Sequence, residues 1–218
     1  MNPVRHLVWD WNGTLLDDAH VCVAAINCLL SARGLQTIPG VPGYRERFVF
    51  PVVDYYRELG FDLPNEDWDA LAREFHAALR EVDDSRLRPD APDVLHAVRS
   101  RGIPQSILSL CEQSLLERKL RECGVFDCFD RVRGVDNLDG ASKLEVGRRL
   151  FAELALPPSD VLLVGDTLHD HEVAQALGCR CILVSCGHQT PGRLADSGRR
   201  IFATLTDVVA SLGNPATP

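Results

Sequence analysis

Lysine is scarce in this chain and unevenly placed. Of the 23 basic residues among 218, only Lys119 and Lys143 are lysines, so residues 1–118 contain none. A reaction in which a lysine amine forms an imine with a carbonyl substrate therefore has no candidate in the first half of the chain.

Long apolar runs and metal-type cysteine spacings are also absent. No run approaches the roughly 20 apolar residues that cross a membrane, and polar residues interrupt the N-terminal stretch MNPVRHLVWDWNG before a signal-peptide core can form. The eight cysteines include no Cys-x-x-Cys pair and no Cys/His set with zinc spacing. We expect reduced, mostly buried cysteines in a cytoplasmic protein.

The composition is that of an ordinary globular protein with an acidic surface. Hydrophobic residues make up 45% and charged residues 25%, with a formal charge of −8. An acidic surface argues against nucleic-acid and anionic-membrane partners. We expect a small-molecule partner, and the sequence leaves monomer and homodimer both open.

The spacing of apolar residues divides the chain into two kinds of segment. Residues 4–9 predict a short buried strand, residues 17–84 predict helices without a strand, and residues 37–51 predict mostly loop. After residue 89, helices alternate with apolar strands, which is typical of a parallel sheet covered on both faces. We therefore predict an α/β, doubly wound core from residues 1–16 and 89–218, interrupted by an all-helical insert at residues 17–88.

Several predicted strands end in residues that can carry chemistry. The first ends at Asp10, another near Ser109, and a third at Asp166, with Asp170 just beyond, while Lys143 opens a helix. Ligands bind at the carboxyl ends of parallel strands. Carboxylates suit Mg²⁺, and a hydroxyl and an ammonium suit phosphate. Helix capping or surface exposure could account for any one of these residues taken alone, but it does not account for the occurrence of all of them in this order along the chain.

These motifs together resemble the haloacid dehalogenase-like hydrolase superfamily. They are Asp10-Trp-Asn-Gly-Thr-Leu, Ser109 after an apolar strand, Lys143, and Gly165-Asp166-Thr-Leu-His-Asp170. The nearest resemblance is to the phosphoglycolate phosphatase-like branch, which carries a helical cap inserted just after the first motif. The resemblance covers essentially the whole chain. It implies a Rossmann-like core with the active site under a cap, and phosphatase activity on a small phosphorylated metabolite.

The resemblance also implies a nucleophile and a metal. Asp10 is the expected nucleophile, which forms an aspartyl-phosphate, and Mg²⁺ is the expected cofactor. The expected metal ligands are the side chains of Asp10 and Asp166, the backbone carbonyl of Asn12, and Asp170, directly or through water.

Five further residues are expected to contact the substrate or support its binding. By resemblance, Ser109 and Lys143 bind the phosphoryl oxygens as part of the catalytic set, and Thr14 steadies the first loop. Arg45 and Arg47 lie in the cap segment that hangs over the active site in related proteins, where an arginine would suit a carboxylate or a second phosphate.

Asn12 departs from the family pattern. The phosphatases typically have a second aspartate there, which acts as general acid and base, and such assistance is worth roughly 10²–10⁴-fold. A primary amide can supply neither role, so three explanations remain open. The leaving group needs no proton, another group such as His20, His169 or His171 replaces the aspartate, or the enzyme is slow.

Asn12 also raises two alternatives to a competent phosphatase. One is a phosphate-binding or regulatory protein that has lost turnover, and the other, less favoured, is a haloacid dehalogenase. The phosphonate-hydrolase branch, which uses a cap lysine, is excluded because residues 17–88 contain no lysine.

Overall fold

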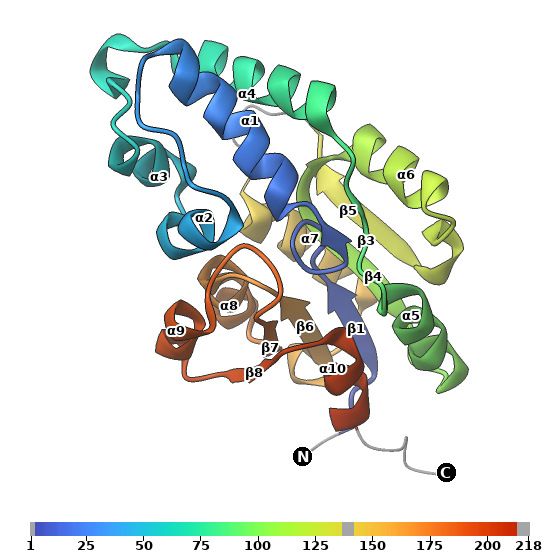
Figure 1. Ribbon diagram of the computed structural model, residues 1–218. Coiled ribbons are helices and arrows are strands. Elements are labelled where there is room, and N and C mark those ends of the chain that lie inside the picture. Colours follow the sequence, from blue (N-terminus) through green and yellow to red (C-terminus); the bar gives the residue numbers. More distant parts are fainter. Residues whose placement is uncertain (1–2, 137–141, 213–218) are drawn as a thin grey trace.

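The computed structural model describes residues 3–136 and 142–212. Its centre is a six-stranded parallel sheet with the strand order β5-β4-β1-β6-β7-β8 (Figure 1). The strands are β1 (His6–Trp9), β4 (Gln105–Glu112), β5 (Arg131–Val135), β6 (Val161–Gly165), β7 (Arg180–Val184) and β8 (Arg200–Phe202). This confirms the predicted α/β fold with a Rossmann-like parallel sheet.

Helices cover both faces of the sheet. Side chains of α5 (Ala91–Ser100), α6 (Gln113–Glu122) and α10 (Leu205–Ser211) belong to one hydrophobic cluster. Side chains of α7 (Lys143–Leu154), α8 (Leu168–Leu177) and α9 (Pro191–Leu194) belong to another. Leu7 and Trp9 of β1 belong to the first cluster and Val8 to the second, which explains why three successive residues of this strand are apolar. Among the described helices, none combines the length and apolar character that crossing a membrane requires.

Four helices lie between β1 and the rest of the core in the sequence. They are α1 (Ala19–Ala32), α2 (Val41–Arg47), α3 (Val52–Glu58) and α4 (Trp68–Val82). They share a third hydrophobic cluster, and α1 and α4 pack along each other beyond the carboxyl end of β1 (Figure 1). We call α1–α4 and their connecting segments the helical insert.

Two short strands join the insert to the core. β2 (Leu16–Asp17) and β3 (Arg86–Leu87) pair antiparallel, so the chain enters and leaves the insert side by side. Short 3₁₀ helices occur elsewhere, at Leu63–Asn65, Phe126–Cys128, Pro158–Asp160 and Ala195–Ser197.

The predictions about the insert missed two details. Residues 37–51 are loop at both ends, as predicted, but α2 occupies Val41–Arg47 between them. Its proline lies in the first turn, where a helix tolerates the missing N–H. The all-helical expectation for residues 17–88 also fails at both edges, because Asp17 belongs to β2 and Arg86–Leu87 form β3.

A buried arginine holds the loop after β1 in place. Arg88 follows β3 and is only 8% exposed. Its guanidinium donates to the carbonyl oxygens of Gly13 (2.7 Å), Thr14 (3.0 Å) and Cys186 (2.8 Å). One side chain therefore ties the first loop, the exit from the insert and the loop after β7.

Replacing Arg88 with methionine should destabilise the fold. Each buried polar group left without a partner costs roughly 1–3 kcal/mol, so we expect the free energy of unfolding to fall by about 3 kcal/mol. Urea unfolding would measure the change. Arg86→Met, at an exposed position of β3, is the matched control and should stay within about 0.5 kcal/mol. Equal losses in the two variants would contradict the assigned role of Arg88.

Candidate active site

The sheet register brings the two motif aspartates to the same edge. Trp9 of β1 pairs with Ile107 of β4 and with Val164 of β6. Asp10 follows β1, and its N–H donates to the Val164 carbonyl at 2.9 Å. Asp166 directly follows β6, so the carboxyl ends of both strands deliver a carboxylate to one place.

Three carboxylates and one ammonium form a buried cluster. The oxygens of Asp10, Asp166 and Asp170 lie within 4.8 Å of one another, and the residues are 6%, 0% and 1% exposed. Lys143, at the start of α7, donates to Asp10 Oδ1 and, at 2.5 Å, to Asp170 Oδ1. One ammonium does not balance three carboxylates, and the donor set of hard oxygens fits a divalent cation such as Mg²⁺.

The environment shifts the pKa values of these groups in different directions. Burial raises the pKa values of Asp10 and Asp166, and neighbouring carboxylates add to the effect. Burial acts in the same sense on Asp170, but the Lys143 ammonium and the hydrogen bond from Thr167 together outweigh it, so the pKa of Asp170 is lowered. The two carboxylates in turn raise the pKa of Lys143, which keeps its charge.

Hydrogen bonds fix the orientation of the carboxylates. The Thr14 hydroxyl lies 3.0 Å from Asp10 Oδ2 and 3.0 Å from Asp166 Oδ1, although its one proton serves only one of them at a time. Asp170 Oδ2 accepts bonds from the N–H and hydroxyl of Thr167 at 3.0 and 2.7 Å. The Asp170 N–H in turn donates to Thr167 Oγ1 at 3.3 Å, which completes the capping box of α8. Asp170 therefore caps a helix and also faces the cluster.

Glycines leave the space that these carboxylates fill. A Cβ at Gly187 would lie 2.0 Å from Asp166 Oδ2, and one at Gly13 would lie 2.3 Å from the same atom. Gly13 also has φ +76°, a conformation that side chains disfavour. The glycine of the first motif is thus required both by the turn and by the carboxylate beside it.

The side chain of Asn12 is held by the carboxylate of Asp18, which precedes α1. Its amide donates to Asp18 Oδ2 at 2.7 Å, and the N–H of Gly13 donates to Asp18 Oδ1 at 2.8 Å. His188 Nε2 lies 3.3 Å from Asp18 Oδ1. Burial opposes charge on both partners, but their pairing lowers the pKa of Asp18 and raises the pKa of His188 to about 9.

Sequence reasoning missed His188 and Asp18. The main-chain N–H of His188 donates to Asp166 Oδ2 at 2.6 Å, and its Nδ1 lies 3.0 Å from the Tyr44 hydroxyl. The only signal was that His188 follows the last strongly apolar strand, β7. Nothing local in the sequence indicates that its ring meets Asp18 at the start of α1.

Ser109 lies in the strand next to β1. It is 1% exposed, and its hydroxyl accepts a hydrogen bond from the Cys111 N–H at 3.0 Å. β4 continues to Glu112, beyond the strand end predicted near Ser109, with irregular pairing to β5 after Leu108. Its contact with a phosphoryl group stays a prediction.

The two arginines of α2 have different surroundings. Arg45 is half-buried and donates to the carbonyl oxygens of Ser185 and, at 3.1 Å, Gln189 in the loop after β7. Arg47 is exposed. Arg45 therefore joins the insert to the core in this arrangement, and contact of either arginine with substrate stays a prediction.

The three histidines proposed to replace the missing acid have other partners. His20 pairs with Asp84, and His171 accepts a bond from Arg199. His169 stacks on Phe50 of the insert with ring centroids 4.6 Å apart. These contacts leave the proposed acid–base roles as untested predictions.

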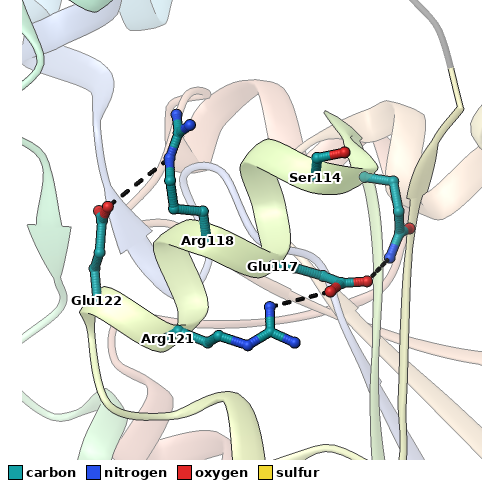
Figure 2. Close-up of a pocket in the computed structure, with 6 residues that line it drawn as sticks. Ser114, Glu117, Arg118, Arg121 and Glu122 are labelled. Carbon is teal, nitrogen blue, oxygen red and sulfur yellow. Dashed lines mark hydrogen bonds and ion pairs between the residues drawn. The ribbon is translucent and has the colours of Figure 1, made fainter.

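A surface hollow of about 450 Å³ lies elsewhere, along α6 (Figure 2). Its charges are paired within the same helix, Arg121 with Glu117 at 3.0 Å and Arg118 with Glu122 at 3.8 Å. It brings together no group with catalytic chemistry, so the buried cluster remains the candidate active site.

Comparison with known proteins agrees with this geometry. Phosphoglycolate phosphatase from Nitrosospira multiformis is 29% identical over 217 residues, which are 95% of this chain and 91% of that protein. A haloacid dehalogenase-like hydrolase from Streptococcus pneumoniae shares the fold with TM-score 0.80 at 16% identity, covering 98% of this chain and 100% of that one. A putative phosphoglycolate phosphatase from Lactobacillus plantarum has TM-score 0.81 at 15% sequence identity, covering 97% of this chain and 100% of that one. Residues 4–178 match the haloacid dehalogenase-like hydrolase family, and the chain therefore belongs to it, as its motifs predicted.

Proposed function

We propose that this hydrolase is a Mg²⁺-dependent phosphatase that acts on a small phosphorylated metabolite through an aspartyl-phosphate on Asp10. The observation that carries the proposal is the meeting of three buried carboxylates and the Lys143 ammonium at the carboxyl edge of the sheet. Membership of the family and the phosphatase activity named for its curated relatives support it. Phosphoglycolate, the substrate in those names, is the first candidate.

The chemistry divides between the nucleophile and the groups that neutralise charge. A carboxylate oxygen of Asp10 attacks phosphorus and displaces the alcohol, and water then cleaves the aspartyl-phosphate to release phosphate. Lys143 offsets the repulsion between carboxylate and phosphate dianion. Asp10, the Asn12 carbonyl, Asp166 and Asp170 would hold Mg²⁺, which supplies further neutralisation when bound.

Residues 17–88 act as a cap in this proposal. The cluster is too deeply buried for a substrate to reach it in the arrangement described, so the insert must move away from the core. β2 and β3 carry both connections and are the proposed hinge. The contacts that must break include two hydrogen bonds between the insert and the core. Arg45 donates to the Gln189 carbonyl in the loop after β7, and the Gln189 amide donates to the Phe48 carbonyl at 3.0 Å.

Asn12 sets the kind of leaving group that this site can release. Its amide is held by Asp18 and cannot transfer a proton to an alkoxide. A substrate whose alcohol leaves without protonation would be hydrolysed efficiently. The same residue motivates a second candidate function, a phosphate-binding regulator without turnover.

Replacing the nucleophile separates the two functions. Asp10→Asn should lower the rate of Mg²⁺-dependent phosphate release by about 10⁴-fold or more, because the amide cannot form the phosphoenzyme. Chelation of Mg²⁺ should abolish release, and added Mg²⁺ should restore it. Asp136→Asn, at an exposed carboxylate, is the matched control and should keep the wild-type rate. A wild-type protein that binds phosphate but releases none from any ester would favour the regulator.

The leaving group should govern the rate. We expect p-nitrophenyl phosphate to exceed alkyl phosphates, phosphoglycolate included, by at least about 100-fold in kcat/KM, since only alkyl esters need the missing acid. This ratio reports formation of the phosphoenzyme, because its later hydrolysis is common to all esters. Steady-state phosphate release at low substrate concentration would measure the ratio, and equal kcat/KM values would mean that another residue supplies the proton.

Exchanging the groups at positions 12 and 18 should show that they interact directly. Asn12→Asp alone would place two carboxylates in contact and destabilise the fold, and Asp18→Asn alone would remove the charged partner. The double variant restores an amide–carboxylate pair with its ends reversed. We expect a favourable coupling of about 1–2 kcal/mol in a double-mutant cycle from urea unfolding. Additive losses would show that the two side chains act independently.

A further inference from the structure

A second set of metal-binding side chains lies beside the carboxylate cluster. Asp18, Cys22 and His188 each offer one ligand atom, and these atoms lie within 4.8 Å of one another. Asp18 precedes α1 and Cys22 lies one turn further, so both side chains project from the same face of the helix. His188 approaches from the loop after β7, and Asp18 and His188 are both buried.

We propose that Asp18, Cys22 and His188 form a second cation site, which takes a divalent ion of the zinc class. Their carboxylate, thiolate and imidazole make a mixed oxygen, sulfur and nitrogen donor set, which favours Zn²⁺ or Co²⁺ over Mg²⁺. The cluster at Asp10 offers carboxylate oxygens and favours hard cations. The two sites therefore differ in the metals they select.

Neighbouring groups orient the three ligands. The Tyr44 hydroxyl holds His188 Nδ1 at 3.0 Å, which leaves Nε2 directed at Asp18 Oδ1, 3.3 Å away. Asn12 and the Gly13 N–H hold the two Asp18 oxygens at 2.7 and 2.8 Å. Such partners fix the rotamer and tautomer of metal ligands, so this site is organised beyond the mere proximity of three side chains.

Binding requires no oxidation or reduction. Zinc-class ions bind thiolate and neutral imidazole, so the proton of the Cys22 thiol and that of a charged His188 pass to solvent as the Sγ and Nε2 lone pairs bind the ion. Three protein ligands leave a fourth tetrahedral position for water or substrate.

The proposed site would join the helical insert to the core. Cys22 belongs to the helical insert, whereas His188 belongs to the core. An ion bound to both would hold the insert in the position described, where Arg45 and Phe48 also contact the loop after β7.

The test is a Co²⁺ titration of the full chain in excess Mg²⁺, which fills the carboxylate cluster. We expect one Co²⁺ per chain, a thiolate-to-Co²⁺ charge-transfer absorption in the near ultraviolet, and its loss when Zn²⁺ displaces Co²⁺. Cys22→Ser should abolish the absorption. Cys28→Ser is the matched control, because Cys28 lies exposed on the same helix, and it should leave the absorption unchanged.

Two further variants keep the test decisive. His188→Gln, whose main-chain bond to Asp166 is retained, should weaken Co²⁺ binding by at least about 100-fold, and Tyr44→Phe by about 10-fold. Circular dichroism would establish that each variant is folded. A wild-type chain without the absorption, an absorption that persists in folded Cys22→Ser, or a Co²⁺ affinity that is unchanged in folded His188→Gln would overturn the proposal.

Discussion

The candidate active site depends on keeping three carboxylates close together away from water. Repulsion between such charges is strong where the dielectric constant is low. The ammonium of Lys143 and the hydroxyl of Thr14 offset part of it at Asp10, Asp166 and Asp170. The negative charge that remains suits the divalent cation proposed for this cluster. The parallel sheet makes this arrangement possible, because adjacent strands end at the same edge and hold the groups rigidly.

The amide at position 12 changes what surrounds that cluster. A carboxylate there would repel Asp18, whereas the amide donates to it, and Asp18 in turn holds His188. His188 also binds Asp166 through its main chain and Tyr44 through its ring. Position 12 thus links the loop after β1, the insert and the loop after β7, so its chemistry bears on the placement of the insert as well as on the proposed leaving-group chemistry.

The insert and the core are packed separately. The four helices share a hydrophobic cluster distinct from the two clusters on either face of the sheet. Hydrogen bonds from Arg45 and Gln189 to main-chain carbonyls, together with the stacking of Phe50 on His169, join the two parts. Hydrogen bonds and a few aromatic contacts, including those of Tyr44 and Phe48 with His188, break at lower cost than a shared apolar core, which supports the proposed opening of the site.

The sequence by itself determined the fold class, most helices and strands, and the carboxylates at the strand ends, because apolar periodicity and strand termination are local properties of the chain. It did not predict β8, a three-residue strand that begins with an exposed arginine, or α2, whose helix contains proline and glycine. Only the tertiary structure decided that Asp18, Cys22 and His188 meet and that Arg88 is buried against the first loop. Those contacts depend on how the insert docks on the core, which brings together residues far apart in the sequence.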